Sequence, residues 1–230
     1  MDLKKKSFSM DFMGRPLTLE VSKIAEQANG AVLAKYGETM VLATAVMEGT
    51  DLEKDYLPLM VEYEHKFYSI GKILGGRFMK REGKSTDSAV LSARMVDRTI
   101  RPLFDYRLRR DLQVVITILS FDKENDHTFL GLLAASTALG ISDIPWGGPV
   151  GAVNVAQLGG KASVEPKLSD AVAAGFKGFV SGTEDFINMI EFDGHEAREA
   201  DVAMAFEAAH EAIKKLIDFQ KKIIAEVGKK

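Results

Sequence analysis

Residues 129–139 carry apolar or small side chains around almost the whole circumference of a potential helix. The stretch is rich in Leu and Ala and contains no charged residue. A helix that is hydrophobic all round is typical of a protein interior rather than of its surface. The segment therefore predicts a buried helix, which the rest of the chain must cover.

Strand patterns precede this segment and also follow it. Residues 17–21 alternate apolar with polar side chains, the period of a half-buried strand. Residues 31–36 and 39–44 flank Gly37-Glu38, a two-residue connection that suits a type II′ hairpin because glycine comes first. Further apolar segments predict strands over residues 57–63, 114–119, 150–158, 176–181 and 186–192.

Two more helices are predicted. One starts with Asp87 as a candidate N-cap and stops before Pro102, and the other is a long helix over about residues 195–227. Because strands and helices are mixed without regular βαβ alternation, the expected class is α+β. We expect a single domain over residues 1–230, with an N-terminal part at about 7–145, strands over about 146–194 and the long helix at its end.

Length and composition limit the class of protein. The chain has 230 residues, 46% hydrophobic and 27% charged, which is ordinary for one globular domain. No apolar run approaches the roughly 18 residues of a membrane span. The basic N-terminus lacks the apolar stretch of a signal peptide, and there are no cysteines. We therefore expect no contact with a membrane and a cytoplasmic location.

Charge is concentrated in one part of the chain. The formal net charge is only −3, yet residues 66–110 contain 12 Lys or Arg against four Asp or Glu. A basic block inside an otherwise acidic protein indicates an anionic ligand that is bound at one place. The alternative is an ordinary solvated surface of charged side chains.

Residues 66–84 lack a regular pattern and predict a long loop, and long loops in compact domains are usually functional. Its glycines free the backbone, Phe78 offers a stacking face, and Lys80 and Arg81 offer positive charge. Single-stranded RNA is held by this combination, because every base has a π-face and every nucleotide a phosphate. The alternative is a flexible surface loop with incidental charges.

The predicted helix after this loop carries Arg94 and Arg98, and Arg101 follows one turn later. Steps of four and three residues put the three guanidinium groups on one helix face, where they could follow a phosphate backbone. The alternative is an ion-pair network, since Asp97 is within reach of both Arg94 and Arg101.

The sequence argues against several other kinds of site. The four histidines (His65, His127, His195 and His210) lack the spacing of metal ligands, so we expect no metal site in this chain. Nucleophile-elbow, P-loop and dinucleotide-binding motifs are also missing.

Residues 76–84 (GRFMKREGK) and 92–104 (SARMVDRTIRPLF) resemble the signature stretch of the first core domain of the polynucleotide phosphorylase family. Segments 30–45, 144–151 and 180–184 follow in the family's order, so the resemblance covers roughly residues 7–227. It implies a ribonuclease PH-like fold, in which mixed β-sheets pack with α-helices and a long helix ends the domain.

The resemblance also implies an activity. Members of this family degrade RNA from 3′ to 5′ with inorganic phosphate as co-substrate, release nucleoside diphosphates and use Mg²⁺. Each subunit has two ribonuclease PH-like domains, and three subunits form a ring around an RNA channel. The chain is then expected to be the N-terminal part of a longer protein that works in mRNA degradation, with other RNA-degradation proteins as possible partners.

The same resemblance assigns RNA-binding residues. The segment Phe78, Met79, Lys80 and Arg81 is similar to the constriction of the family's channel, although Met79 stands where the family has an aromatic side chain and Lys80 where it has arginine. The face formed by Arg94, Arg98 and Arg101 is expected to support catalysis by holding the RNA 3′ end.

Two departures from the family's catalytic domain predict that this domain is not catalytic. Asp126, His127 and Thr128 stand where that domain has a serine-rich phosphate loop, and an aspartate repels phosphate. The region of the metal-binding aspartates begins near Glu165, and the position six residues later is Ala171. We expect the domain to guide single-stranded RNA. The alternatives are a free-standing non-catalytic subunit of an exosome-like ring and an active enzyme of the ribonuclease PH type.

Overall fold

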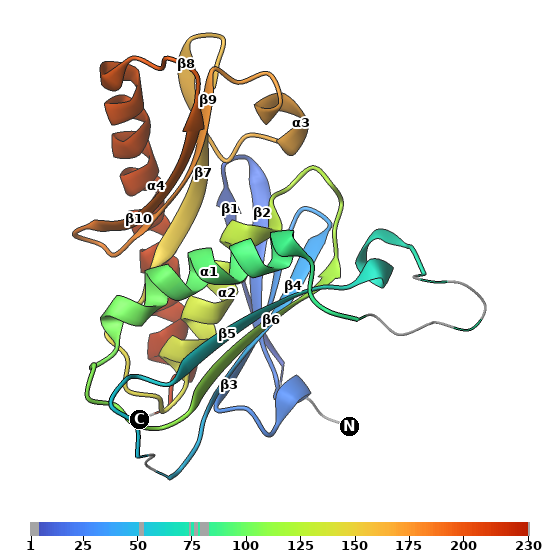
Figure 1. Ribbon diagram of the computed structural model, residues 1–230, viewed down its shortest axis with the longest axis vertical. Helices are drawn as coiled ribbons and strands as arrows, with labels where there is room; N and C mark the ends of the chain where they lie inside the picture. The colour runs from blue at the N-terminus through green and yellow to red at the C-terminus, as the bar shows by residue number, and fades with distance from the viewer. Residues whose placement is uncertain (1–4, 51–52, 74, 76–77, 79–82, 230) are drawn as a thin grey trace.

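The computed structural model describes residues 5–50, 53–73, 75, 78 and 83–229, and it contains two β-sheets (Figure 1). In the larger sheet every neighbouring pair is antiparallel except β5 and β6, which run parallel. Its strands lie in the order β1 (Lys6–Phe12), β2 (Arg15–Val21), β3 (Gly30–Tyr36), β4 (Thr39–Met47), β6 (Leu112–Ser120) and β5 (Leu59–His65).

The smaller sheet is antiparallel, and the long helix α4 (Glu199–Val227) packs against three of its strands, β7, β8 and β9. A single helical turn, α3 (Leu168–Ala171), follows β8. The strands lie in the order β10 (Ile187–Gly194), β9 (Phe176–Gly182), β7 (Gly151–Leu158) and β8 (Lys161–Val164).

Helix α2 (His127–Ile141) holds the two parts of the molecule together. It packs on β3 and β4 of the larger sheet, and also on β7 and α4. Every residue from 128 to 139 is buried, which confirms the prediction of an enclosed helix. Helix α1 (Asp87–Ile100) packs on β5 and also contacts α2 and β10, so it lies where the two sheets meet (Figure 1).

The hairpin predicted around Gly37 is confirmed. Tyr36 pairs with Thr39 across the turn, and Gly37 has φ +59° while Glu38 does not have a positive φ. A positive φ at the first turn residue alone is the type II′ pattern, and glycine accommodates it without steric cost.

Two predicted helix starts are wrong. Thr86, not Asp87, is the N-cap of α1, because its side-chain oxygen accepts a hydrogen bond from the Ala89 backbone nitrogen at 3.2 Å. The long helix begins at Glu199 rather than near residue 195, since Glu196 has φ +47° and Arg198 is extended.

Several short elements escaped prediction. The region 66–84 is not irregular throughout, because residues Phe67–Ile70 form a 3-10 turn, η2. Strand β8 and the turn α3 are short and were also missed. Strand β1 was missed as well, although Phe8, Met10 and Phe12 alternate with polar residues along it. Among the described residues, no helix is both long and apolar enough to cross a lipid bilayer.

Candidate functional site

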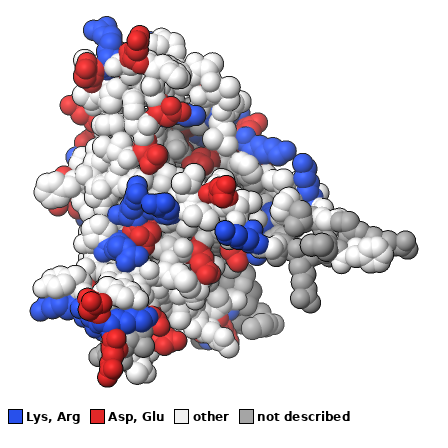
Figure 2. Space-filling view, in the orientation of Figure 1, with Lys and Arg blue, Asp and Glu red and all other residues white. Residues whose placement is uncertain are grey.

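The arginine-bearing helix α1 presents one buried and one exposed face. Its buried residues include Val96 and Ile100, whereas Arg94 and Arg98 are exposed. Figure 2 shows Lys and Arg side chains, interspersed with acidic ones, on the face of the molecule that α1 occupies. This helix therefore exposes positive charge, as the sequence predicts.

A groove of about 510 Å³ lies between α1 and the edge strand β5. Arg94, Asp97 and Arg101 line it from the helix side, and residues 59–64 line it from the strand side. Arg98 is not part of this lining. The structure thus brings Arg94 and Arg101 to one groove and places Arg98 on the exposed surface beside it.

Arg101 is engaged in contacts that join α1 to β5. Its Nε donates to Asp97 Oδ2 at 2.9 Å, and its Nη2 donates to Asp97 Oδ1 at 2.6 Å. The same Nη2 also donates to the backbone oxygen of Leu59 at 3.0 Å. The ion-pair alternative is thus correct for Arg101.

Arg94 and Arg98 behave differently. Within the part of the chain that the structure describes, neither side chain makes a hydrogen bond or ion pair, so both guanidinium groups are open to a ligand. Of the three arginines of this region, these are the two whose side chains are open to an external anion.

The loop residues predicted to bind RNA are only partly described. Phe78 is 92% exposed, so its ring is accessible to a partner. Met79, Lys80 and Arg81 lie outside the described residues.

Asp126, which stands where the family's catalytic domain is expected to have its phosphate loop, caps the N-terminus of α2. Asp126 is the N-cap of α2, and its Oδ2 accepts hydrogen bonds from the Phe129 backbone nitrogen at 3.3 Å and from Asn154 Nδ2 at 2.9 Å. A helix N-terminus attracts anions through free backbone N–H groups. Here a carboxylate already occupies that place, so a phosphate would meet negative charge.

Aromatic and imidazole rings pack beside this N-terminus. The rings of His65 and His127 are 4.7 Å apart, and Tyr63 contacts both. Burial lowers the pKa of His127, and burial together with the neighbouring His127 lowers the pKa of His65 to about 4. Both imidazoles are therefore neutral at pH 7. The described residues contain no group of three His, Asp or Glu side chains that could hold a metal ion.

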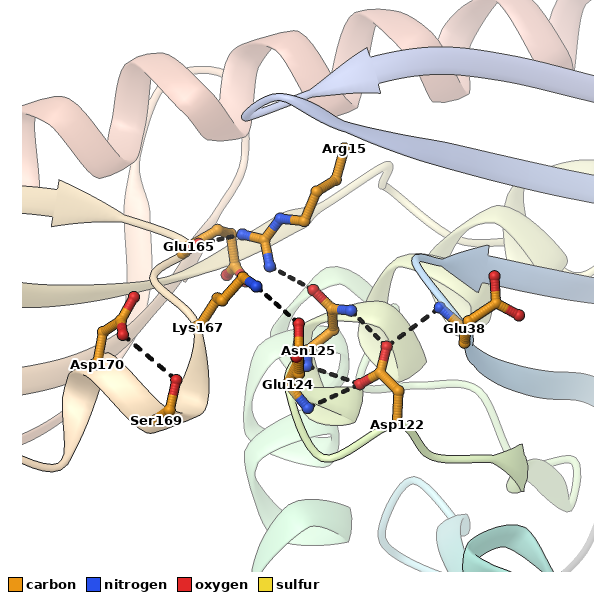
Figure 3. Close-up of polar contacts among 9 residues, drawn as sticks. All are labelled: Arg15, Glu38, Asp122, Glu124, Asn125, Glu165, Lys167, Ser169 and Asp170. Atoms are coloured by element: carbon orange, nitrogen blue, oxygen red, sulfur yellow. Dashed lines mark hydrogen bonds and ion pairs between the residues drawn. The ribbon is translucent and has the colours of Figure 1, made fainter.

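A polar network that sequence reasoning missed includes Asn125, the residue before Asp126 in the chain (Figure 3). The Arg15 guanidinium donates to Asn125 Oδ1 and to the backbone oxygen of Glu165, and it lies 4.6 Å from the centre of the Tyr36 ring. These contacts attach the start of β2 to the segments that precede α2 and α3. No local pattern signals them, because they join residues 110 and 150 positions apart.

Two carboxyl groups in this network have shifted pKa values. Burial of Asp122 opposes its ionisation, but hydrogen bonds from the backbone nitrogens of Asn125 and Glu124 outweigh it and lower the Asp122 pKa to about 2. Burial raises the pKa of Glu165, which is enclosed and receives hydrogen bonds from Asn154. Glu165 is thus an interior side chain rather than an accessible ligand.

The two positions that depart from the catalytic pattern meet in one cavity. Asp126 and Ala171 both line a space of about 260 Å³ between the smaller sheet and α1 and α3. Ala171 contributes a methyl group to this lining, at the position for which the sequence predicts a carboxylate in a catalytic domain.

Comparison with known proteins gives consistent matches. The 3′ exoribonuclease family, domain 1, matches residues 13–145. The chain is 43% identical over 228 residues to a polyribonucleotide nucleotidyltransferase from Exiguobacterium sibiricum and 46% identical over 221 residues to one from Pseudothermotoga lettingae. These alignments cover 99% and 96% of this chain but only 31% of each relative, so the chain spans about a third of their length.

A solved structure shares the fold. The crystal structure of rice Rrp46 superposes with a TM-score of 0.72 over 96% of this chain and 94% of the rice chain, at 13% sequence identity. At that identity the likeness concerns the fold alone.

Proposed function

The chain belongs to the 3′ exoribonuclease family, domain 1, and on this premise we propose that it is the non-catalytic, RNA-guiding first core domain of a phosphorolytic exoribonuclease. Its fold is ribonuclease PH-like, with two mixed or antiparallel sheets, packed helices and a long final helix. In this proposal RNA runs over α1 and the segment around Phe78.

The observation that carries RNA binding is the pair of unengaged guanidinium groups, Arg94 and Arg98, on the exposed face of α1. Guanidinium groups suit phosphate because their N–H donors match its oxygens. Phe78 adds an exposed ring on which a base can stack. Charge and stacking carry no base code, so the expected ligand is single-stranded RNA without strong sequence preference.

The observation that carries the non-catalytic role is the Asp126 carboxylate at the N-terminus of α2. Inorganic phosphate does not fit there, because Asp126 repels it and already accepts the Phe129 N–H. Mg²⁺ does not fit either, because Glu165 is enclosed with a raised pKa and Ala171 offers no side-chain oxygen. Inorganic phosphate and Mg²⁺ would both act in a second domain of the whole protein.

The whole protein would then release nucleoside diphosphates from RNA 3′ ends in the cytoplasm. Three copies would form a ring, with the Phe78–Arg81 segments around its channel, and other RNA-degradation proteins could join it. The names of the similar proteins support this activity for the whole protein.

Two measurements on the purified chain test the proposal. Single-stranded RNA should bind in fluorescence anisotropy, with an affinity that falls as salt rises. Poly(A) incubated with phosphate and Mg²⁺ should yield no nucleoside diphosphate above the level of an Arg94→Ala preparation from the same host. Turnover above that level would contradict the non-catalytic role, and a lack of RNA binding at low salt would contradict the guiding role.

A further inference from the structure

The cavity of about 260 Å³ beside Asp126 has features that RNA guidance does not use. Its floor is one face of the smaller sheet, where Phe179 is only 5% exposed, and its walls include Met95 of α1 and Leu168 of α3. Drug-sized pockets usually start at about 300 Å³, so this space suits a small ligand with an apolar body.

Carboxylates lie in the lining of this apolar space. Asp126 Oδ2 is occupied by two hydrogen bonds, but Oδ1 receives none from the described residues. Glu191, on the edge strand β10, has no hydrogen bond or ion pair within the described ranges.

The other two charges of the lining neutralise each other. Lys177 Nζ lies 3.2 Å from Asp193 Oδ2, so this ammonium group is already paired. The cavity therefore keeps two unmatched negative charges, Asp126 and Glu191, with apolar surface in the same lining.

We propose that this cavity binds a linear aliphatic amine with two ammonium groups. One ammonium donates to Asp126 Oδ1 and the other to Glu191, while the methylene chain packs on Phe179 and Leu168. An ammonium group has three N–H donors and no acceptor, so carboxylates are its natural partners. A phosphate or a carboxylic acid would instead meet uncompensated negative charge.

The proposal is independent of RNA guidance, because α1 contributes Met95 to this cavity but neither Arg94 nor Arg98. Its ligand class follows from the lining alone. A ligand held here would also contact the N-terminus of α2 through Asp126.

The experiment compares small probes by isothermal titration calorimetry and by shifts of backbone amide signals in NMR. The probes are 1,4-diaminobutane, 1,6-diaminohexane, butylamine and hexanoate. We expect a diamine to bind about two- to fivefold more tightly than butylamine, as one partly exposed ion pair would give. Hexanoate should not bind, and the shifted amides should belong to β9, β10 and α3.

Variants separate this site from general attraction to an acidic protein. Glu191→Gln should remove the diamine's advantage over butylamine. Ala171→Phe, at a half-exposed position, should fill the cavity and reduce binding of every amine more than tenfold without changing any charge. The matched control Glu207→Gln removes an exposed charge on α4 and should leave binding unchanged.

A third variant tests the inner carboxylate. Asp126→Asn keeps an oxygen that can cap α2, and it should weaken the diamine and butylamine together. The proposal is overturned if diamines bind no more tightly than butylamine, if Glu191→Gln and Glu207→Gln have equal effects, or if the shifted amides spread over the whole surface.

Discussion

Asp97 and Arg101 form a two-point ion pair one helical turn apart, with N–O distances of 2.6 and 2.9 Å, at the end of α1. Arg101 also donates to the backbone oxygens of Leu57 and Leu59. The three arginines of this region are therefore not equivalent. Arg101 stabilises the junction between α1 and the strand region, whereas Arg94 and Arg98 are open to a ligand.

The first prediction separates these roles. Arg94→Ala and Arg98→Ala should each lower RNA affinity and reduce the slope of log affinity against log salt by about 0.7, because each removes one phosphate contact. Arg101→Ala should instead lower the free energy of unfolding by about 1–2 kcal/mol, since it leaves Asp97 and a backbone oxygen without a donor. Anisotropy at several salt concentrations and urea unfolding measure the two effects. The control is Lys222→Ala, which removes an exposed charge on α4. Equal salt slopes for all variants would show that RNA does not contact α1.

A second prediction concerns Phe78. Phe78→Ala should weaken RNA binding by about 1–3 kcal/mol with little change in the salt slope, because stacking on a base involves no phosphate charge. Phe186→Ala is a matched control, since Phe186 is also exposed, at 73%, but lies directly before β10. Anisotropy with a short poly(A) strand gives both values. If the two variants bind alike, Phe78 does not stack on RNA.

The third prediction tests the cap of α2. Asp126→Ala should lower the free energy of unfolding by about 0.5–2 kcal/mol, because the Phe129 N–H loses its acceptor. Asp126→Ser should lower it less, since the serine oxygen can accept the same hydrogen bond. Urea unfolding with linear extrapolation measures both. An equal loss in the two variants would mean that the carboxylate's charge, not the capping bond, stabilises this end of the helix.

A fourth prediction concerns the loss of folding stability at acidic pH. Burial, with a further contribution from His127, lowers the His65 pKa to about 4, while an unfolded chain has a His pKa of about 6.5. The unfolded state thus binds the proton more tightly, and the stability that neutral His65 supplies is complete above pH 6.5 and is lost as pH falls toward 4.

The variant His65→Phe keeps a ring against Tyr63 and His127 but cannot bind a proton. Its melting temperature should fall less than that of the parent between pH 7 and pH 4.5. The acidic groups titrate in both proteins, so the difference between the two profiles reports the coupled pair His65 and His127. Identical pH profiles would show that His65 is as basic in the folded protein as in the unfolded chain.

Several elements could be predicted from the sequence because their causes are local. Helix α2 follows from a stretch with no polar face, and the β3–β4 hairpin follows from Gly37 between two apolar segments. The family resemblance gave the fold because the segment 92–104 is specific. The N-cap of α1 was misplaced by one residue because Thr86 and Asp87 are both good capping residues.

The candidate site could be predicted only in part. Spacing put Arg94, Arg98 and Arg101 on one helix face, but it could not show which of them pairs with Asp97 and which stays open. Asp97 is three residues from Arg94 and four from Arg101, so both pairs are allowed by helix geometry. The backbone oxygens of Leu57 and Leu59, just before and at the start of β5, favour Arg101, and they lie more than forty positions away in the chain.

The sequence by itself thus determined the buried helix, the turn, the basic segment and the carboxylate at position 126. The tertiary structure alone decided that Arg15 reaches Asn125, that β5 runs parallel to β6, and that Asp126 shares a cavity with Ala171 and Glu191. The physical reason is the distance along the chain between the residues that interact. Helical and turn patterns arise from residues a few positions apart, whereas sheet order and cavities arise from packing between segments whose separation leaves no periodic trace in the chain.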